Sequence, residues 1–388
     1  MKIRKAYKFK LKIDKTLNKK LWQYAGHSRF VWNYFWRINQ ERLKNGHKIM
    51  RYGEMDYWSK LMKKSEEYNF LAEAPAHIIQ QKLKDLDRAY MDAFDKKQRN
   101  KRLPTKRKKQ LHSSFRFPLP KQIVIDNRRI KLPKIGWIGF YKSQEITGDV
   151  KNVTVSHQSG GWYISIQVEQ DIETIHVAND NNKVIGIDVG IAKFATCATL
   201  NSDQVYLPKH VYRTIENRLG KEQRKLKHKQ KFSRNWVKQT KKICKLHSKI
   251  ANIRNDYLHK ISSEICKNHA TIFIEDLKVS NMSKSAKGTE LNPGKNVKAK
   301  SGLNKSILDQ GWYKFRRQLE YKSNWQGGKV IAVEPKYTSQ TCSSCGDKSK
   351  ENRLSQSKFV CQKCDFVINA DVNAARNILA DGLSRVGL

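Results

Sequence analysis

Two cysteine pairs near the C-terminus restrict the fold of this chain more than any other feature of its sequence. Cys342 and Cys345 form the first pair, and Cys361 and Cys364 form the second. Zinc takes four thiolates in a tetrahedron at about 2.3 Å, and two CxxC knuckles on facing hairpins supply that geometry. The alternative is four unligated cysteines, but this spacing rarely arises without metal. Since no fifth ligand is evident, we predict one structural Zn²⁺.

The other cysteines and the N-terminus indicate where the protein works. Cys197, Cys244 and Cys266 stand alone, which suits a reducing cytosol rather than a disulfide framework. The first residues alternate bases with apolar side chains, whereas a signal peptide would have an unbroken apolar stretch. No apolar run approaches the roughly 20 residues that span a bilayer. We expect a soluble, cytoplasmic protein with no membrane partner.

The charge of the chain points to its partners. There are 78 Lys and Arg against 35 Asp and Glu, which gives a net charge of +43. An ordinary metabolic enzyme has no need of this surplus. It attracts a polyanion by counterion release, and nucleic acid fits better than an anionic membrane. At 38% hydrophobic residues the chain can still bury cores, and its length suggests two or three domains.

In the N-terminal half, the hydrophobic period changes twice. Residues 3–13 alternate basic and apolar side chains, as a strand does, and residues 17–94 have helical spacing. A basic linker follows at 96–109, and short β-rich runs return between 115 and 169. Because the helices separate the first strand from the others, we expect residues 3–13 to complete a small β-barrel into which the helices are inserted.

The C-terminal half alternates strands with helices. Two apolar strands, 184–187 and 271–274, are each followed by a carboxylate. The other predicted elements are a long helical pattern with a Lys- and Arg-rich stretch at 221–249, a polar loop at 278–301 long enough to act as a lid, a helix at 307–325, a strand at 329–333 and a last helix at 370–379.

Three carboxylates lie at the ends of predicted elements. Asp188 and Glu275 follow the two buried strands, where α/β folds place their chemistry, and Asp371 begins the last helix. Two divalent ions held by such groups can activate a water and stabilise the leaving oxygen of a phosphodiester. Mg²⁺ suits these hard oxygen ligands. The spacing leaves another interpretation open, in which Asp188 is a turn residue and Asp371 a helix N-cap.

Four segments resemble, in order, the motifs of a known family. They are residues 186–190, 273–277, 337–346 and 371–378. The chain is similar there to TnpB, the transposon-encoded, RNA-guided DNA endonuclease related to the type V CRISPR effectors. The N-terminal half is also similar, at 28–33, 86–90 and 114–117, so the resemblance covers essentially the whole chain.

The resemblance implies a multidomain α+β fold. Its parts are a wedge β-barrel at 1–16 and 105–182, a helical recognition lobe at 17–104, and a RuvC-like nuclease domain of the RNase H fold at 183–388 with a zinc ribbon inserted at 336–368. It also implies that Asp188, Glu275 and Asp371 are catalytic and hold two Mg²⁺ ions. One departure is visible: Asp365 follows the second cysteine pair, where the family commonly has Gly.

The function implied is cleavage of double-stranded DNA by Mg²⁺-dependent hydrolysis at a single site. The partners would be a guide RNA derived from the transposon end, with one protein per guide, and target DNA with a short adjacent motif. The place of action would be the nucleoid of a prokaryotic cell. Two alternatives are a nuclease-inactive RNA-guided repressor and a strand-transferring transposase. The presence of all three carboxylates disfavours the first, and the whole-chain similarity disfavours the second.

Four residues of the N-terminal half are candidate contacts to nucleic acid. Arg29 and Asn33 lie beside an aromatic cluster, and Lys106 and Arg107 lie in the basic linker. We predict that the adjacent motif of the target is recognised here. The alternative is that Asn33 caps or bridges helices and that the linker bases contact only the RNA backbone.

Overall fold

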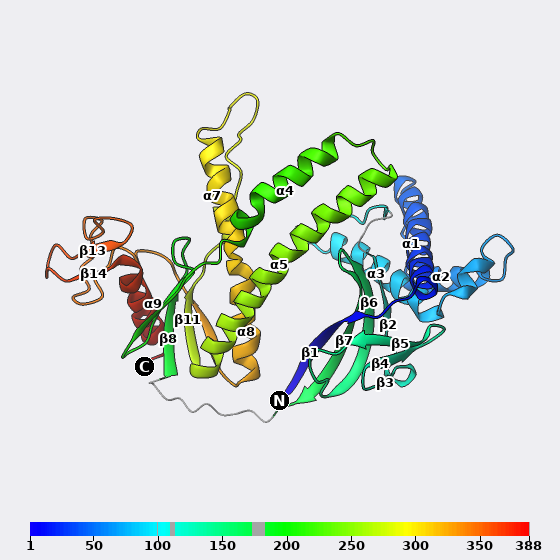
Figure 1. The fold of residues 1–388 in the computed structure, drawn as a ribbon, viewed down its shortest axis with the longest axis horizontal. Helices are drawn as coiled ribbons and strands as arrows, with labels where there is room; N and C mark the ends of the chain where they lie inside the picture. Colours follow the sequence, from blue (N-terminus) through cyan, green and yellow to red (C-terminus); the bar gives the residue numbers. More distant parts are fainter. Residues whose placement is uncertain (99, 109–112, 173–182, 388) are drawn as a thin grey trace. The chain divides into compact units, whose positions relative to one another are not determined.

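The computed structural model describes residues 1–98, 100–108, 113–172 and 183–387. They belong to two compact units, of which the first ends at Ile172 and the described part of the second begins at Lys183. The predicted domain boundary at 182, and Arg99 and Lys109 of the basic linker, lie outside the described residues or at their edge. The units are described one at a time (Figure 1).

The first unit contains a seven-stranded antiparallel sheet of order β2-β6-β7-β1-β5-β4-β3. Strand β1 pairs along its length with β7, so the prediction that the first strand joins the later ones is confirmed. The order has two ends, so the described strands form a half-barrel where we expected a barrel. The strands are β1 (Lys2–Leu11), β2 (Ser113–Phe117), β3 (Val124–Asp126), β4 (Arg129–Leu132), β5 (Gly136–Tyr141), β6 (Asp149–Gln158) and β7 (Gly161–Asp171).

The described residues between β1 and β2 form three α-helices. They are α1 (Lys15–Lys44), α2 (Tyr52–Met62) and α3 (Ala76–Phe94). Asp14 begins α1 by accepting the Leu17 N–H at 2.6 Å, as an N-cap does. Buried side chains recur at helical spacing along α3, and one hydrophobic core joins the helices to the sheet. The predicted helical insertion is therefore present, without a core of its own.

The second unit is built on a mixed five-stranded sheet of order β10-β9-β8-β11-β12. Strands β8, β11 and β12 are parallel, β9 runs antiparallel to β8, and β10 runs antiparallel to β9. The strands are β8 (Val184–Asp188), β9 (Ala195–Ala198), β10 (Asp203–Tyr206), β11 (Thr271–Glu275) and β12 (Lys329–Val333), and a separate hairpin consists of β13 (Lys358–Val360) and β14 (Val367–Asn369).

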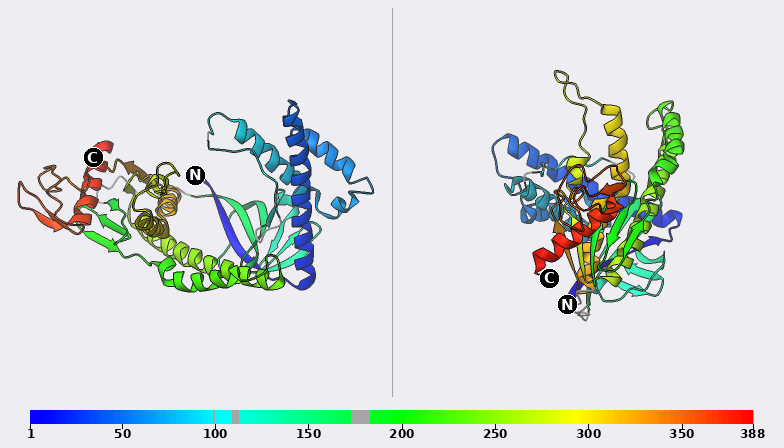
Figure 2. Two further views of the ribbon diagram at one scale, coloured as in Figure 1. Left: turned by 90° about the horizontal axis from the view of Figure 1, so that it is seen from above. Right: turned by 90° about the vertical axis from the view of Figure 1, so that its left-hand side faces the viewer.

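Helices cover both faces of this sheet, which explains why its central strands are continuously apolar. The helices are α4 (Val211–Lys227), α5 (Arg234–Asn268), α6 (Val279–Met282), α7 (Val297–Gln310), α8 (Trp312–Trp325) and α9 (Ala370–Val386). Ile187 and Ile274 pack with α5 and α8, whereas Val184 and Phe273 pack with α9. The unit therefore has three layers, and α9 lies against β8 (Figures 1 and 2).

Gly186 allows α9 to pack closely on β8. A Cβ at this position would lie 2.7 Å from the Leu379 backbone nitrogen and closer still to the Ala375 carbonyl oxygen. Real Cβ atoms do not approach backbone this closely, so any side chain here would push the helix away from the strand. Because α9 carries Asp371, this glycine also sets where that carboxylate lies.

Three predictions about the second unit need correction. The helix predicted at 307–325 is broken at Gly311, whose φ of +75° ends α7 before α8 begins. The polar loop predicted at 278–301 is shorter, because α6 occupies its start and α7 begins at Val297. The last helix continues to Val386 rather than residue 379. No helix in the described part of the chain is long and apolar enough to cross a membrane.

Candidate metal centres

Asp188 and Glu275 meet at one edge of the second unit's sheet. Each is the last residue of its strand, and β8 and β11 pair in parallel with Ile187 opposite Ile274. Parallel strands in this register end side by side. Asp188 and Glu275 therefore come directly after paired residues, at equivalent positions on neighbouring strands. Asp188 is therefore the last residue of a strand and not a turn residue.

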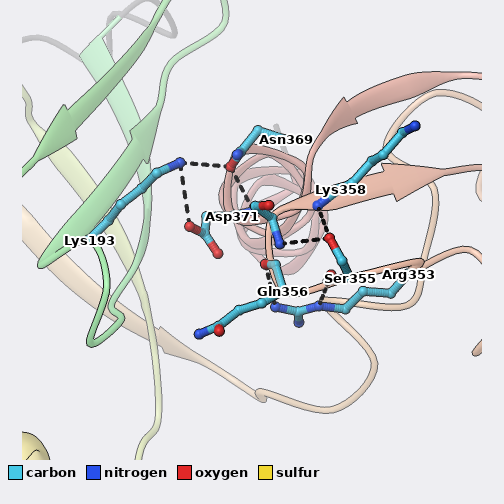
Figure 3. Close-up of polar contacts among 8 residues, drawn as sticks. Lys193, Arg353, Ser355, Gln356, Lys358, Asn369 and Asp371 are labelled. Carbon is cyan, nitrogen blue, oxygen red and sulfur yellow. Dashed lines mark hydrogen bonds and ion pairs between the residues drawn. The ribbon is translucent and has the colours of Figure 1, made fainter.

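Asp371 reaches this region from the first turn of α9. The N-cap of that helix is Asn369, whose Oδ1 accepts the Asp371 N–H at 3.1 Å. The structure therefore does not support Asp371 as the N-cap. Lys193, from the segment between β8 and β9, donates a 2.8 Å hydrogen bond to Asn369 and lies 3.5 Å from the Asp371 carboxylate (Figure 3).

The charges of Glu275 and Asp371 act on Asp188. Burial and the negative charges of Glu275 and Asp371 raise the pKa of Asp188 to about 7, while the positive charge of Arg353 opposes the shift. Partly buried like charges are unfavourable without a cation between them. This is the electrostatic environment that a divalent cation would relieve.

Glu275 is held by a threonine. Burial raises the pKa of its carboxyl, and the Thr338 hydroxyl, which donates a 2.8 Å hydrogen bond to Oε1, lowers it. Thr338 is itself nearly buried. The hydrogen bond both orients one oxygen of Glu275 and favours its ionised form, which is the form that binds a cation.

Sequence reasoning missed three residues that act on these carboxylates: Lys193, Thr338 and Arg353. Lys193 follows Asp188 by five positions and Thr338 lies within a segment already singled out, so proximity to the predicted ligands was a usable signal. Arg353 lies between the two cysteine pairs and is positioned by the carbonyl oxygens of Ser355 and Gln356, at 3.4 and 3.2 Å (Figure 3). Nothing in the sequence indicates that its charge acts on Asp188.

The four predicted cysteines converge. Among the described residues they are the one group of three or more His, Cys, Asp or Glu side chains whose ligand atoms all lie within 4.8 Å of one another. The Cys342–Cys364 and Cys345–Cys361 Sγ pairs are 3.8 and 3.6 Å apart. Sulfurs at the corners of a tetrahedron with 2.3 Å metal bonds are separated by about 3.8 Å. The cluster therefore fits Zn²⁺.

The two knuckles have equivalent backbone hydrogen bonds but different turn residues. The Gly346 N–H donates to the Cys342 carbonyl at 2.9 Å, and the Asp365 N–H donates to the Cys361 carbonyl at 3.1 Å. Both turn residues are left-handed, with φ of +74° and +55°. Asp adopts this conformation at a cost that Gly does not have. The departure from the family pattern therefore strains the second knuckle without altering its hydrogen bonds.

A pocket of about 730 Å³ opens beside Glu275. Trp312 and Leu277 contribute apolar surface to it, while Arg316 and Arg317 contribute positive charge. Arg316 is already paired with Asp276 and Glu320, at 2.5 and 3.0 Å. A concave, partly basic surface next to the carboxylates could receive a nucleic-acid strand.

The structure separates the four candidate nucleic-acid contacts of the N-terminal half. Arg29, Lys106 and Arg107 line one pocket of the first unit. Asn33 does not line it, because its amide bonds the Arg107 backbone in both directions, at 3.0 and 2.7 Å. Asn33 therefore bridges α1 to the linker, whereas the alternative interpretation had it cap or bridge helices.

Comparison with solved structures defines the class of this fold. The chain superposes on Cas12f1 in a cryo-EM structure of a Cas12f1–sgRNA–target DNA complex with a TM-score of 0.55 at 16% identity, over 94% of this chain and 83% of that one. The protein is thus a Cas12f-like multidomain protein in its fold.

Sequence comparisons give the family. Residues 164–286 match the model described as "Probable transposase", residues 312–378 the "Cas12f1-like, TNB domain", and residues 1–48 a "Helix-turn-helix domain". In this structure residues 1–48 contain β1 and one continuous helix, α1.

Two relatives cover most of the chain. The Escherichia coli K12 protein InsQ, named as an RNA-guided DNA endonuclease, is 49% identical over 98% of this chain and 93% of its own length. A Streptomyces pristinaespiralis protein with the same description is 31% identical over 83% and 75%. This chain belongs to the TnpB family.

Proposed function

We propose that this protein is an RNA-guided DNA endonuclease that cuts double-stranded DNA at one RuvC-like site. The observation that carries the proposal is that Asp188 and Glu275 end paired parallel strands, and that the charges of Glu275 and Asp371 both raise the pKa of Asp188. The names of the family relatives support the guided activity. The net charge of +43 suits a protein that holds both RNA and DNA.

In this proposal the three carboxylates hold two Mg²⁺ ions within an RNase H-like domain. The bound ions would activate a water and stabilise the leaving oxygen of the phosphodiester. The residues of the chain then have separate tasks. Thr338 keeps Glu275 oriented and ionised, the cap at Asn369 fixes the start of the helix that carries Asp371, and Lys193 balances the Asp371 charge.

The four cysteines would hold one structural Zn²⁺. Their hairpin comes between β12 and α9 in the chain, and Asn373 of α9 accepts the Ser343 N–H at 2.9 Å and donates to the Thr341 carbonyl at 2.7 Å. The cluster is thus tied to the helix that carries Asp371. We further propose a guide RNA from the transposon end, a target with a short adjacent motif, and action at the nucleoid.

Purification with the endogenous RNA, followed by cleavage of a plasmid library, tests the function. The library carries a sequence matching the copurified guide, flanked by randomised bases. We expect Mg²⁺-dependent linearisation that needs the RNA, and loss of cleavage in Asp188→Ala with guided binding retained. Guided binding without cleavage by the wild type would identify a repressor, and RNA-independent strand joining would identify a transposase.

A further inference from the structure

A pocket of about 480 Å³ in the first unit has an unusual charge distribution. It is formed by one face of α1, by α3, by the linker at 105–108 and by the start of β2. Among the described residues, no carboxylate lines it and five cations do: Arg29, Lys82, Lys106, Arg107 and Lys108. Like charges gathered in this way are unfavourable unless an anion lies among them.

Contacts within the chain hold the lining of the pocket in place without a ligand. The Trp32 indole N–H donates to the Thr105 carbonyl at 3.0 Å, and Asn33 fixes the backbone of Arg107. The Arg107 guanidinium then lies 3.8 Å from the centre of the Trp32 ring. Stacking holds the guanidinium plane while its N–H groups stay available at the edge.

Arg29 and Lys82 place further charge around this pocket. Arg29 donates a 3.2 Å hydrogen bond to the Ser113 hydroxyl, and burial lowers its pKa. Lys82 is only 7% exposed, and its ammonium lies 2.9 Å from Asp85. The single negative charge of Asp85 does not neutralise the group of cations, so the pocket stays strongly positive.

One buried group of the pocket lacks a partner. Ser28 is 2% exposed, and its hydroxyl makes no hydrogen bond in the described structure. A buried hydroxyl without a partner is unfavourable, and such groups mark the place of an absent ligand or water. Its position in the lining beside Arg29 means that an anionic oxygen could accept from both.

We propose that this pocket binds one backbone phosphate of a nucleic-acid strand. A phosphate offers several acceptor oxygens for the two arginines, Lys82 and the Ser28 hydroxyl, and needs no carboxylate nearby. The pocket would fix the position of the strand without reading its sequence. The proposal rests on the proposed function only in taking nucleic acid as the ligand.

Salt-dependent binding measures the contact. The full-length protein, wild type and the Arg29→Gln/Arg107→Gln double variant, is titrated without Mg²⁺ against its copurifying RNA, and the RNA complex is titrated against target DNA. For the strand that uses the pocket, we expect roughly tenfold weaker binding in the double variant and a salt slope shallower by about 0.7 to 0.9. Because no cleavage is required, failure of the nuclease proposal would leave this result unaffected.

Arg37→Gln is the matched control, since Arg37 is an exposed residue of the same helix and its guanidinium lies 5.9 Å from the Tyr34 ring centre. If the double variant behaves like this control with both RNA and DNA, the proposal is overturned. If the double variant does not fold, Ser28→Ala decides, because it keeps every charge. We expect about threefold weaker binding from Ser28→Ala and no loss of thermal stability.

A neutral backbone locates the phosphate. Methylphosphonate substitutions, one position at a time, should reveal a position where the wild type loses roughly tenfold in affinity and the double variant loses little. The same effect at every position would refute a single pocketed phosphate. Stabilisation by inorganic phosphate alone, with no change in nucleic-acid binding, would refute the strand as ligand and identify a small-anion pocket.

Discussion

The Lys193 ammonium lies 3.5 Å from the Asp371 carboxylate and donates a 2.8 Å hydrogen bond to Asn369, which caps the helix on which Asp371 lies. A protein cation therefore occupies the surroundings of a proposed metal ligand. It neutralises part of the charge that a divalent ion would otherwise neutralise. The ion pair is partly exposed, so its influence should be modest.

Replacement of Lys193 by Met should tighten divalent-cation binding. The competing positive charge is removed, and a partly exposed pair contributes about 0.5 to 1 kcal/mol, so we expect two- to fivefold higher affinity. Mn²⁺ titration of the protein, followed by electron paramagnetic resonance, measures this without cleavage. Lys225→Met removes a comparable pair with Glu222 and should change nothing. Unchanged or weaker Mn²⁺ affinity in Lys193→Met would contradict the competition.

The Asp188 carboxyl makes stability depend on pH. Its pKa is about 7 in the metal-free fold and near 3.9 in an unfolded chain. Between these values the folded state binds more protons, so the free energy of unfolding falls as pH rises and the loss is complete above pH 7. Asp188→Asn should then be more stable than the wild type at pH 8, by at most roughly 4 kcal/mol.

Urea unfolding in the presence of EDTA, at pH 5 and pH 8, checks this sign. The advantage of Asp188→Asn should be smaller at pH 5, and adding Mg²⁺ should stabilise the wild type more than the variant. The exposed Asp256, which pairs with Lys260 at 2.9 Å, provides the control Asp256→Asn. An Asp188→Asn protein less stable than wild type at pH 8 would show that the ionised carboxylate does not destabilise the folded state.

Loss of the Thr338 hydroxyl should weaken metal binding through Glu275. Thr338→Val keeps the shape but removes the donor, and a hydrogen bond to a charged group contributes about 1.5 to 3 kcal/mol. We expect the Mg²⁺ concentration for half-maximal cleavage to rise at least tenfold. Thr338→Ser should restore it, and Thr341→Val, which removes a hydroxyl bonded only to the Tyr337 carbonyl, should not matter. Equal Mg²⁺ requirements in all variants would show that Glu275 is positioned by other groups.

The knuckle turns can be tested by exchange. Asp365→Gly relieves a left-handed Asp and should raise zinc affinity and stability slightly, by about 0.5 kcal/mol. Gly346→Asp introduces the same strain into the first knuckle and should lower both. Competition with a chromogenic chelator ranks the three proteins. A reversed order would mean that the turns do not govern the cluster, and wild-type protein without zinc would refute the site itself.

Gly186→Ala should separate α9 from β8. The added methyl group meets the backbone of Ala375 and Leu379, so we expect a loss of roughly 2 to 4 kcal/mol in unfolding free energy and weaker Mn²⁺ binding. Gly302→Ala, in α7, meets nothing within 4 Å and should stabilise the protein by about 0.5 to 1 kcal/mol. If both alanines were neutral, the close approach of α9 would not be required.

The parts of the fold with strong periodicity were predictable from the sequence. Strands β8 and β11, the helical insertion and the return of the first strand to the sheet all follow from hydrophobic spacing. The short strands β9, β10, β13 and β14 were missed, because three or four residues give too little pattern. The break at Gly311 was missed because an amphipathic pattern continues on both sides of it.

The candidate site was predictable only where chemistry follows from residue type. Two CxxC pairs predict that the four cysteines lie close together, and carboxylates at the ends of strands predict the same for the acidic residues. Lys193 and Arg353 are different, since a single cation in a basic chain carries no signal of its own, and only the fold shows which of the 78 Lys and Arg face the carboxylates. For the same reason sequence could not show that the Asn33 amide is used internally.

The position of β1 inside its sheet has a consequence for synthesis on the ribosome. This strand is made before the other strands of its sheet, yet its neighbours are β7 and β5, which end at Asp171 and Tyr141. At 5 to 20 residues per second, the nascent strand waits roughly 10 to 30 seconds for β7 to emerge. During that time Lys2, Lys8 and Lys10 keep one face of the strand charged, which discourages pairing with other chains. The lysines on β1 thus protect the polypeptide before the sheet exists.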